Sequence, residues 1–223
     1  AAKIPPEQAA MGVPAHWLPS VHVNNLDETA SKATSLGGRI LAGPMDIPQT
    51  GRYAVLADPQ GATIAIFQAN GPMAGFDGTA EMGKPSWHEL MTTDFRRAFE
   101  FYKALFGWEK IEEVDMGPLG KYFEYGMKGK MFGGMFNRPP EMANMNPFWL
   151  PYFHVKDVEE STAAAKKTGA FVQNGPMEVP GGSWIVVMGD PQGAAFAMHS
   201  AKPTPAKAAA KAVRKAAKKA AKK

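Results

Sequence analysis

Residues 55–68, VLADPQGATIAIFQ, and residues 187–200, VMGDPQGAAFAMHS, contain the same Asp-Pro-Gln-Gly turn at positions 132 residues apart. The similarity extends beyond the turn, because residues 17–68 align without gaps to residues 149–200 with 19 of 52 positions identical. Both copies run from Trp-Leu-Pro through a short His-containing strand, a helix and a Gly-Pro-Met segment to the closing hairpin. Such self-similarity indicates an internal duplication.

Each copy contains the signals for one helix followed by a β-rich segment. Capping boxes and C-terminal glycines mark the helix ends; they are Asn25 with Glu28 and Gly37 in the first copy, and Asp157 with Glu160 and Gly169 in the second. The Asp-Pro-Gln-Gly turn then joins two apolar runs, as a tight hairpin does. Each copy is therefore predicted to fold as β-α-β-β-β.

A third unit of the same order lies between the copies. It begins with a strand at residues 87–92 and a helix that Asp94 caps and Gly107 ends. The apolar face of this helix recurs with helical spacing; it consists of Phe95, Ala98, Phe99, Tyr102, Leu105 and Phe106. Strands are predicted near residues 108–114, 121–127 and 130–136. Gly133 and Gly134 in the last strand indicate a close strand approach or a bulge.

Composition excludes several classes of protein. The 223 residues are 45% hydrophobic and contain no cysteine, so disulfides, thiolate nucleophiles and Cys-bound metals are ruled out. No apolar run approaches the roughly 18 residues of a membrane span, and the N-terminal residues lack a signal-peptide pattern. We therefore expect a cytoplasmic protein.

The residues WHELMTTD (87–94), FYKALFGW (101–108) and the two DPQG hairpins resemble the vicinal oxygen chelate superfamily of glyoxalases, bleomycin-resistance proteins and extradiol dioxygenases. The resemblance covers roughly residues 4–199. It implies an α+β fold in which βαβββ modules pair into a curved mixed sheet around a concave cavity for a small molecule.

The resemblance also implies a division of the chain. Residues 85–200 form a complete glyoxalase-like domain of two modules, and residues 1–70 form the orphan second half of another such domain. Residues 71–84 link them, and residues 201–223 are a Lys/Ala-rich tail expected to be disordered. The orphan module would leave a sheet edge exposed. Two explanations stand: the chain is a fragment of a four-module protein, which we favour, or the module pairs in trans within a homodimer.

Members of this superfamily usually hold a divalent metal on the concave face. At the corresponding positions this sequence has Trp87, Pro151 and Ala197, and the strand at 130–136 offers no acid or His. The first copy has Pro19 and Ala65 at the matching positions. We therefore expect no cofactor. A metal site built from Glu89 and the histidines His88, His154 and His199 is the alternative, and it would need a one-residue slip, because His88 and His154 are expected to point away from the cavity.

The candidate ligand-binding residues are those expected to face the cavity, namely Trp87, Glu89, Tyr125, Phe153, Trp184 and His199. Aromatic side chains stack on planar ligands, although they also fill cores. Glu89 is the best catalytic candidate, because a buried carboxylate is paired, exposed or functional. No second catalytic group is evident, so the sequence leaves catalysis open.

The tail gives a further hypothesis. Residues 202–223 hold nine Lys or Arg and no acid, which leaves the remaining body at about −5. Non-specific nucleic-acid binding would involve Lys207, Lys211, Arg214, Lys215, Lys218 and Lys219. The preferred function is metal-free binding of a small, partly aromatic molecule; the alternatives are a metal-dependent lyase or dioxygenase, and an accessory protein tethered to nucleic acid by its tail.

Overall fold

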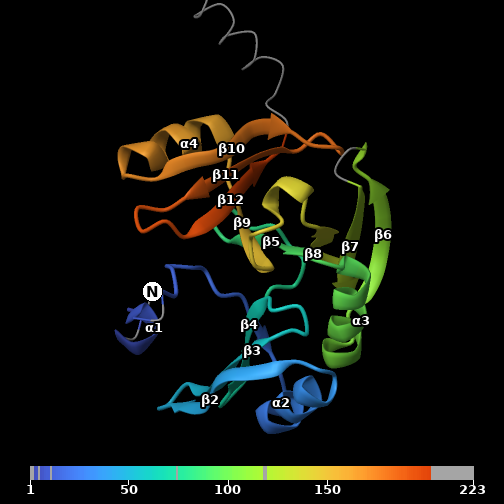
Figure 1. Cartoon of the computed structure of the whole chain (residues 1–223). Helices are drawn as coiled ribbons and strands as arrows, with labels where there is room; N and C mark the ends of the chain where they lie inside the picture. The colour runs from blue at the N-terminus through green and yellow to red at the C-terminus, as the bar shows by residue number, and fades with distance from the viewer. Residues whose placement is uncertain (1–2, 5, 11, 74, 118–119, 202–223) are drawn as a thin grey trace, which may run out of the picture.

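The computed structural model describes residues 3–4, 6–10, 12–73, 75–117 and 120–201, and it contains two β-sheets (Figure 1). One sheet has four strands in the order β1-β4-β3-β2. The other has eight strands in the order β10-β11-β12-β9-β5-β8-β7-β6. Three βαβββ modules build these sheets, and we refer to residues 20–69, 85–137 and 148–200 as the first, second and third module.

The first and third modules are structural copies of each other. The first comprises β1 (Ser20–His22), α2 (Leu26–Ser35), β2 (Arg39–Ile47), β3 (Gly51–Ala57) and β4 (Thr63–Ala69), preceded by α1 (Pro6–Ala10). The third comprises β9 (Phe148–His154), α4 (Val158–Lys167), β10 (Phe171–Glu178), β11 (Trp184–Gly189) and β12 (Ala195–Ser200). The strand registers also correspond. Ser20 pairs with Ala65 in the first module, and the residues 132 positions later, Tyr152 and Ala197, pair in the third.

The second module has the predicted order and nearly the predicted bounds. It comprises β5 (Pro85–Thr92), α3 (Phe95–Phe106), β6 (Glu109–Asp115), β7 (Lys121–Met127) and β8 (Lys130–Asn137), and a short 3-10 helix, η2 (Pro140–Met142), follows it. Its β5 pairs antiparallel with β9 and so joins the second and third modules into the eight-stranded sheet. The predicted α+β fold of paired βαβββ modules is thereby confirmed.

The helix signals in the sequence act as predicted. The Asn25 side chain accepts a hydrogen bond from the Glu28 backbone N–H at 3.1 Å. Asp94 accepts bonds from two backbone N–H groups of the first turn of α3. Gly107, which ends α3, has a left-handed backbone with φ of 74°, a conformation that costs glycine nothing sterically.

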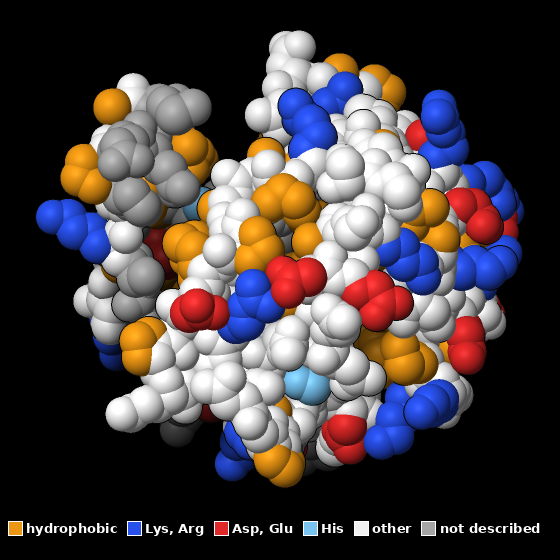
Figure 2. All heavy atoms as spheres, turned by 90° about the horizontal axis from the view of Figure 1, so that it is seen from below, with side chains coloured by type: hydrophobic (Ala, Val, Ile, Leu, Met, Phe, Trp, Pro, Cys, Tyr) orange, Lys and Arg blue, Asp and Glu red, His pale blue; other side chains and the backbone are white. Residues whose placement is uncertain are grey.

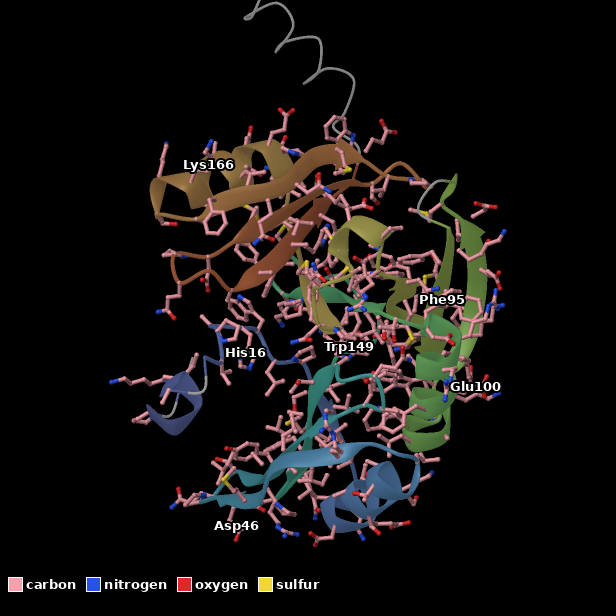
Figure 3. The ribbon with its side chains drawn as sticks, viewed as in Figure 1. His16, Asp46, Phe95, Glu100, Trp149 and Lys166 are labelled. Atoms are coloured by element: carbon pink, nitrogen blue, oxygen red, sulfur yellow. The ribbon has the colours of Figure 1, made fainter. Side chains whose placement is uncertain are left out.

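The main core lies between the first two modules. It contains Leu26 of α2 and Ile64 of β4 together with Phe99 and Tyr102 of α3, all buried. The helix-bearing faces of the two modules therefore pack against each other and share one apolar interior. Trp149 of the third module reaches this interior, whereas Glu100 and Lys166 are labelled on the outer faces of α3 and α4 (Figure 3).

The Asp-Pro-Gln-Gly turn of the first module fixes how the modules meet. The Gln60 side-chain N–H donates to the Asp94 carbonyl at 2.7 Å, and its Oε1 accepts from the Asp94 N–H at 2.6 Å. The hydroxyls of Thr92 and Thr93 also donate to this oxygen. One glutamine thus binds the start of α3 through both ends of its amide.

Within the described part of the chain, no helix combines the length and apolar character that crossing a membrane requires.

We predict that Gln60→Ala lowers the free energy of unfolding by about 2–3 kcal/mol, because it leaves the Asp94 N–H without its partner and removes one of the two hydrogen bonds to the Asp94 carbonyl, which also accepts from the Ala98 N–H. The matched control is Gln192→Ala at the same position of the third module, where the side chain is exposed. The control should change stability by less than about 0.5 kcal/mol. Urea denaturation measures both, and equal effects would show that Gln60 does not hold the modules together.

Candidate functional site

Four side chains on one face of the eight-stranded sheet form a hydrogen-bonded group, the Glu89 cluster: Trp87 and Glu89 of β5, Tyr122 of β7 and Tyr152 of β9. The Tyr122 hydroxyl donates to Glu89 Oε2 at 2.9 Å and the Tyr152 hydroxyl donates to Oε1 at 3.0 Å. Trp87 Nε1 donates to the Tyr122 oxygen at 2.9 Å. Both carboxylate oxygens therefore have a phenol partner.

The alternation of side chains along β5 places Glu89 away from the helices. Leu90 is fully buried in the core beneath α3, so its neighbour Glu89 points to the opposite face, which we call the open side. On this open side, apolar residues of the third module lie beside Glu89. They form a buried apolar group of Leu150, Tyr152 and Ala197, against which Trp87, Phe148, Ile185, Val187 and Ala195 pack. The carboxylate thus sits at the edge of an apolar surface.

Gly134 of β8 makes room for the tyrosine. It is the register partner of Glu89, and a Cβ atom at this position would lie 2.0 Å from the Tyr122 hydroxyl oxygen. Any side chain there would displace the Tyr122 ring from the path across β8 to Glu89. At Gly133 a Cβ atom would lie 1.8 Å from the His88 carbonyl oxygen. The predicted close strand approach is therefore confirmed at Gly133, beside which the register of β7 and β8 also shifts, whereas Gly134 makes room for a side chain.

Burial raises the pKa of the Glu89 carboxyl above its usual value, and the two tyrosine hydrogen bonds oppose that effect without cancelling it. Burial likewise raises the pKa of Tyr122 and of Tyr152 well above that of a free phenol. Both phenols therefore keep their protons at neutral pH. Trp87, Glu89 and Tyr122 are partly exposed, so solvent reaches the cluster from the open side.

The structure separates the six predicted ligand-binding residues. Trp87 and Glu89 belong to the cluster, and His199 lies on the same face as Ala197. His199 Nε2 lies 2.5 Å from the Ser86 hydroxyl, and its ring stacks on His154 with 5.0 Å between centroids. His154 therefore lies on the same face as His199, and the expectation that it points away from the cavity is wrong. Burial, and then the neighbouring His154, lower the pKa of His199 to about 4, so its imidazole is neutral at pH 7.

The other three predicted residues lie on the helix side of the sheet, and their expected placement is wrong. Tyr125 is 2% exposed and stacks on Trp108 in the core beneath α3. Trp184 packs against the α4 cluster that includes Val186. Phe153 contacts Trp17 with ring centroids 5.5 Å apart. The register pairs Tyr152, not Phe153, with Trp87, so it is Tyr152 that shares the open side with Trp87 and Glu89.

Sequence reasoning missed Tyr122 and Tyr152. A signal for Tyr122 was present, because in β7 it alternates with Phe123 and shares a face with the polar Glu124. For Tyr152 no such signal exists, since β9 is apolar on both faces and only its pairing with β5 determines which residues meet Glu89.

Away from the cluster, described residues line a larger and a smaller cavity. The larger, of about 500 Å³, lies where residues 17–20 and the segment before β5 meet β5 and β9, and Trp17, Phe76, His88 and Phe153 line it. The smaller, of about 430 Å³, adjoins His22 and Gln68 of the first module. The larger is the one to which the predicted residue Phe153 contributes.

The donor set does not fit the divalent metal that the fold resemblance implies. Across the described residues, no three His, Asp or Glu side chains come together as potential ligands. Both Glu89 oxygens are bonded to tyrosines, and the strand positions expected to hold ligands carry Trp87, Pro151 and Ala197. We derive no chemistry through a metal.

Known proteins resemble this chain over most of its length. A putative glyoxylase, CFP32, of Mycobacterium tuberculosis is 31% identical over 201 residues, which cover 90% of this chain and 74% of the relative. The anthracycline biosynthesis protein DauV of Streptomyces sp. strain C5 is 30% identical over 190 residues, 84% of this chain and 66% of the relative.

Among solved structures, the 2,3-dioxygenase LapB from Pseudomonas sp. KL28 superimposes with a TM-score of 0.58 at 14% identity, covering 83% of this chain and 72% of that one. The model of the Glyoxalase/Bleomycin resistance protein/Dioxygenase superfamily matches residues 84–198, which include the second module, the Glu89 cluster and all but the last two residues of the third module. The match covers more than half of the chain, and the relatives share its sequence over most of its length, so the chain belongs to this superfamily.

Proposed function

We propose that this protein binds a small, planar, partly aromatic molecule on the open side of its eight-stranded sheet, at the Glu89 cluster and without a bound metal. The observation that carries the proposal is the partly exposed Glu89 carboxyl held between two tyrosine hydroxyls. Ligand sites are mostly apolar with a few placed polar groups. The cluster supplies those polar groups beside the apolar face that includes Leu150 and Ala197.

The chemistry of the cluster suits a ligand that carries a carbonyl or phenol oxygen. Because burial raises the pKa of Glu89, this carboxyl group can donate a proton to a carbonyl oxygen or accept one from a phenol. Trp87 and Tyr122 offer aromatic surface for stacking. Glu89 is thus the group of the cluster able to exchange a proton with the ligand.

The named relatives suggest a class of ligand. Anthracyclines are fused planar rings that bear carbonyl and phenol oxygens, and two Streptomyces relatives are called anthracycline biosynthesis proteins. We therefore propose polycyclic aromatic ketones and phenols as the ligand class.

Calorimetric titration of chelator-treated protein with an anthracycline tests this proposal. Glu89→Gln and Tyr122→Phe should each weaken binding about tenfold, since a hydrogen bond to a charged or buried group contributes on the order of 1.4 kcal/mol. Tyr125→Phe is the matched control, because this tyrosine of the same strand faces the core; its affinity should stay within about twofold. Equal losses in all three variants, or binding that requires added metal, would contradict the proposal.

A second prediction concerns pH. Because burial raises the pKa of Glu89 in the folded state, folding favours its protonated form. The stability that this form contributes is fully present below the unfolded-state pKa and is lost as pH rises through the folded-state pKa. The melting temperature of Glu89→Gln minus that of the wild type should therefore increase as pH rises above about 4.3, the ordinary pKa of a glutamate. Glu100→Gln on the outer face of α3 is the control for the loss of a carboxylate, and a Glu89→Gln difference that does not grow with pH would contradict a raised pKa of Glu89.

The tail carries a separate proposal, non-specific binding of nucleic acid. Residues 202–223 lie outside the described residues, but their nine basic side chains without an acid supply the charge. On the face of the body seen in Figure 2, basic and acidic side chains are interspersed, which offers no continuous basic patch there. We predict salt-sensitive DNA binding by the full chain, measured by fluorescence anisotropy, that is lost when the chain ends at residue 201. Retention of binding by the shortened chain would refute a role for the tail.

A further inference from the structure

The larger cavity lies on the helix side of the eight-stranded sheet, outside the Glu89 cluster. It forms where two connecting segments, residues 17–20 and parts of residues 75–85, meet the side chains of β5 and β9. Its volume of about 500 Å³ falls within the range of roughly 300–1,000 Å³ that is typical of small-molecule sites. The proposed function makes no use of this cavity.

Aromatic side chains form the walls of the cavity. Trp17 and Phe153 pack against each other with ring centroids 5.5 Å apart, and Phe76 and His88 do so at 5.8 Å. The face of an aromatic ring carries negative charge density and attracts cations. Walls of this kind suit a ligand with an apolar body and a positive charge.

Hydrogen bonds and ring packing hold the segment between the first two modules in place as one of these walls. His154 of β9 donates its Nδ1–H to the Ala80 carbonyl at 2.8 Å, and its own carbonyl accepts from the Gly83 N–H at 2.8 Å. At the other end of the segment, Phe76 packs on Phe132 of β8 with ring centroids 5.7 Å apart. The cavity is therefore preformed, as small-molecule sites usually are.

His88 supplies a hydrogen-bond acceptor to the cavity. Burial lowers the pKa of its imidazole, so the ring is neutral at pH 7. The Phe132 backbone carbonyl accepts a hydrogen bond from one ring nitrogen, which leaves the other nitrogen as an acceptor. Among the described residues, Trp184 Nε1 is the one buried side-chain nitrogen or oxygen without a partner. The acceptor nitrogen of His88 is therefore open to solvent, and the cavity is the hollow that this residue lines.

Charged side chains stand at the rim of the cavity, and among the described lining residues the acidic ones outnumber the basic. Asp77 and Glu81 line it together with Lys84, and Lys84 forms an ion pair with Glu81 at 2.6 Å. Hydrogen bonds from Thr79 lower the pKa of Asp77 to about 2, so this carboxylate is ionised at neutral pH. Its partner Lys130, at 3.1 Å, lies outside the lining. Exposed ion pairs are weak, so a ligand cation can share Asp77 with Lys130.

We propose that this cavity is a second binding site, for a small primary ammonium ion with an apolar body. The ammonium N–H groups donate to His88, the charge lies beside Asp77 and the aromatic rings, and the apolar body fills the space between Trp17 and Phe153. A neutral ligand leaves the charge of Asp77 unused, and an anion is repelled by it. The site lies on the opposite side of the sheet from the Glu89 cluster and does not depend on the function proposed there.

Cyclohexylammonium is the probe, because it joins a primary ammonium group to an apolar ring that is not aromatic. Cyclohexanol has nearly the same shape and is the neutral comparison. NMR titration of the full chain follows the indole N–H signal of Trp17, a side chain that lines the cavity and is 45% exposed. We expect a saturable shift with cyclohexylammonium and binding of cyclohexanol that is about fivefold weaker.

Two substitutions test the polar groups. Asp77→Asn removes the charge at the rim, so it should weaken the binding of cyclohexylammonium about threefold and leave that of cyclohexanol unchanged. His88→Phe keeps a ring against Phe76 but removes the acceptor nitrogen, so it should weaken the binding of both probes about tenfold.

Asp115→Asn is the matched control for Asp77→Asn. Asp115 accepts from the N–H of Gly117, two residues on, and pairs with Lys121 at 2.9 Å. Asp77 likewise accepts from the N–H two residues on and pairs with a lysine at 3.1 Å. Since Asp115 lies in β6 and does not line the cavity, its substitution should leave the binding of both probes unchanged.

Three results would overturn the proposal. One is the lack of a saturable shift of the Trp17 signal, and another is equal affinity for cyclohexylammonium and cyclohexanol, which would show an apolar cavity that does not recognise charge. The third is an equal loss of binding in Asp77→Asn and Asp115→Asn. Because Asp77 is exposed, its substitution decides the matter even where His88→Phe fails to fold.

Discussion

A chain of hydrogen bonds through the Tyr102 hydroxyl connects all three modules, and the arrangement of the molecule depends on it. Trp149 of the third module donates its Nε1–H to Tyr102 at 3.1 Å, and Tyr102 of the second donates to Asp58 of the first at 3.0 Å. Asp58 is 1% exposed, and burial raises its pKa despite these donors. Buried polar networks are stable only when their members are satisfied, so the three modules have to keep this relative placement.

This constraint assigns different tasks to the two faces of the eight-stranded sheet. The shared core occupies the helix side beneath α3, and the open side carries the Glu89 cluster and the apolar surface beside it. Glu89 then has to be accommodated there, and Tyr122 and Tyr152 do so because Gly134 allows one of the rings to cross β8. On the helix side of the sheet, Asp58 is hydrogen-bonded to Tyr102. On the open side, Glu89 is hydrogen-bonded to Tyr122 and Tyr152 and is partly exposed.

The fold could be predicted from the sequence because its signals are local and repeated. The two copies of the repeat, 132 residues apart, fold as the first and third modules. Helices begin after the predicted caps Asn25, Asp94 and Asp157, and the predicted apolar face of α3 lies in the core. The site was predictable only in part. Trp87 and Glu89 follow from alternation within one strand, whereas Phe153 and Trp184 depended on the register between strands.

That register is set by tertiary contacts that a single sequence does not encode locally. A one-residue error in parity moves every side chain of a strand to the other face. In β9 both faces are apolar, so nothing in the sequence corrects such an error. The prediction therefore placed Phe153 on the open side, where the structure has Tyr152. In β7 the polar Glu124 marked the open side, so Tyr122 was within reach of sequence reasoning.

The position of a bound planar aromatic ligand, determined from a crystal structure of the complex, tests the proposed binding site most directly. We predict a ligand on the open side of the eight-stranded sheet, with an oxygen atom within hydrogen-bonding distance of Glu89 or Tyr122. A ligand in the cavity between Trp17 and Phe153, on the helix side, would contradict it.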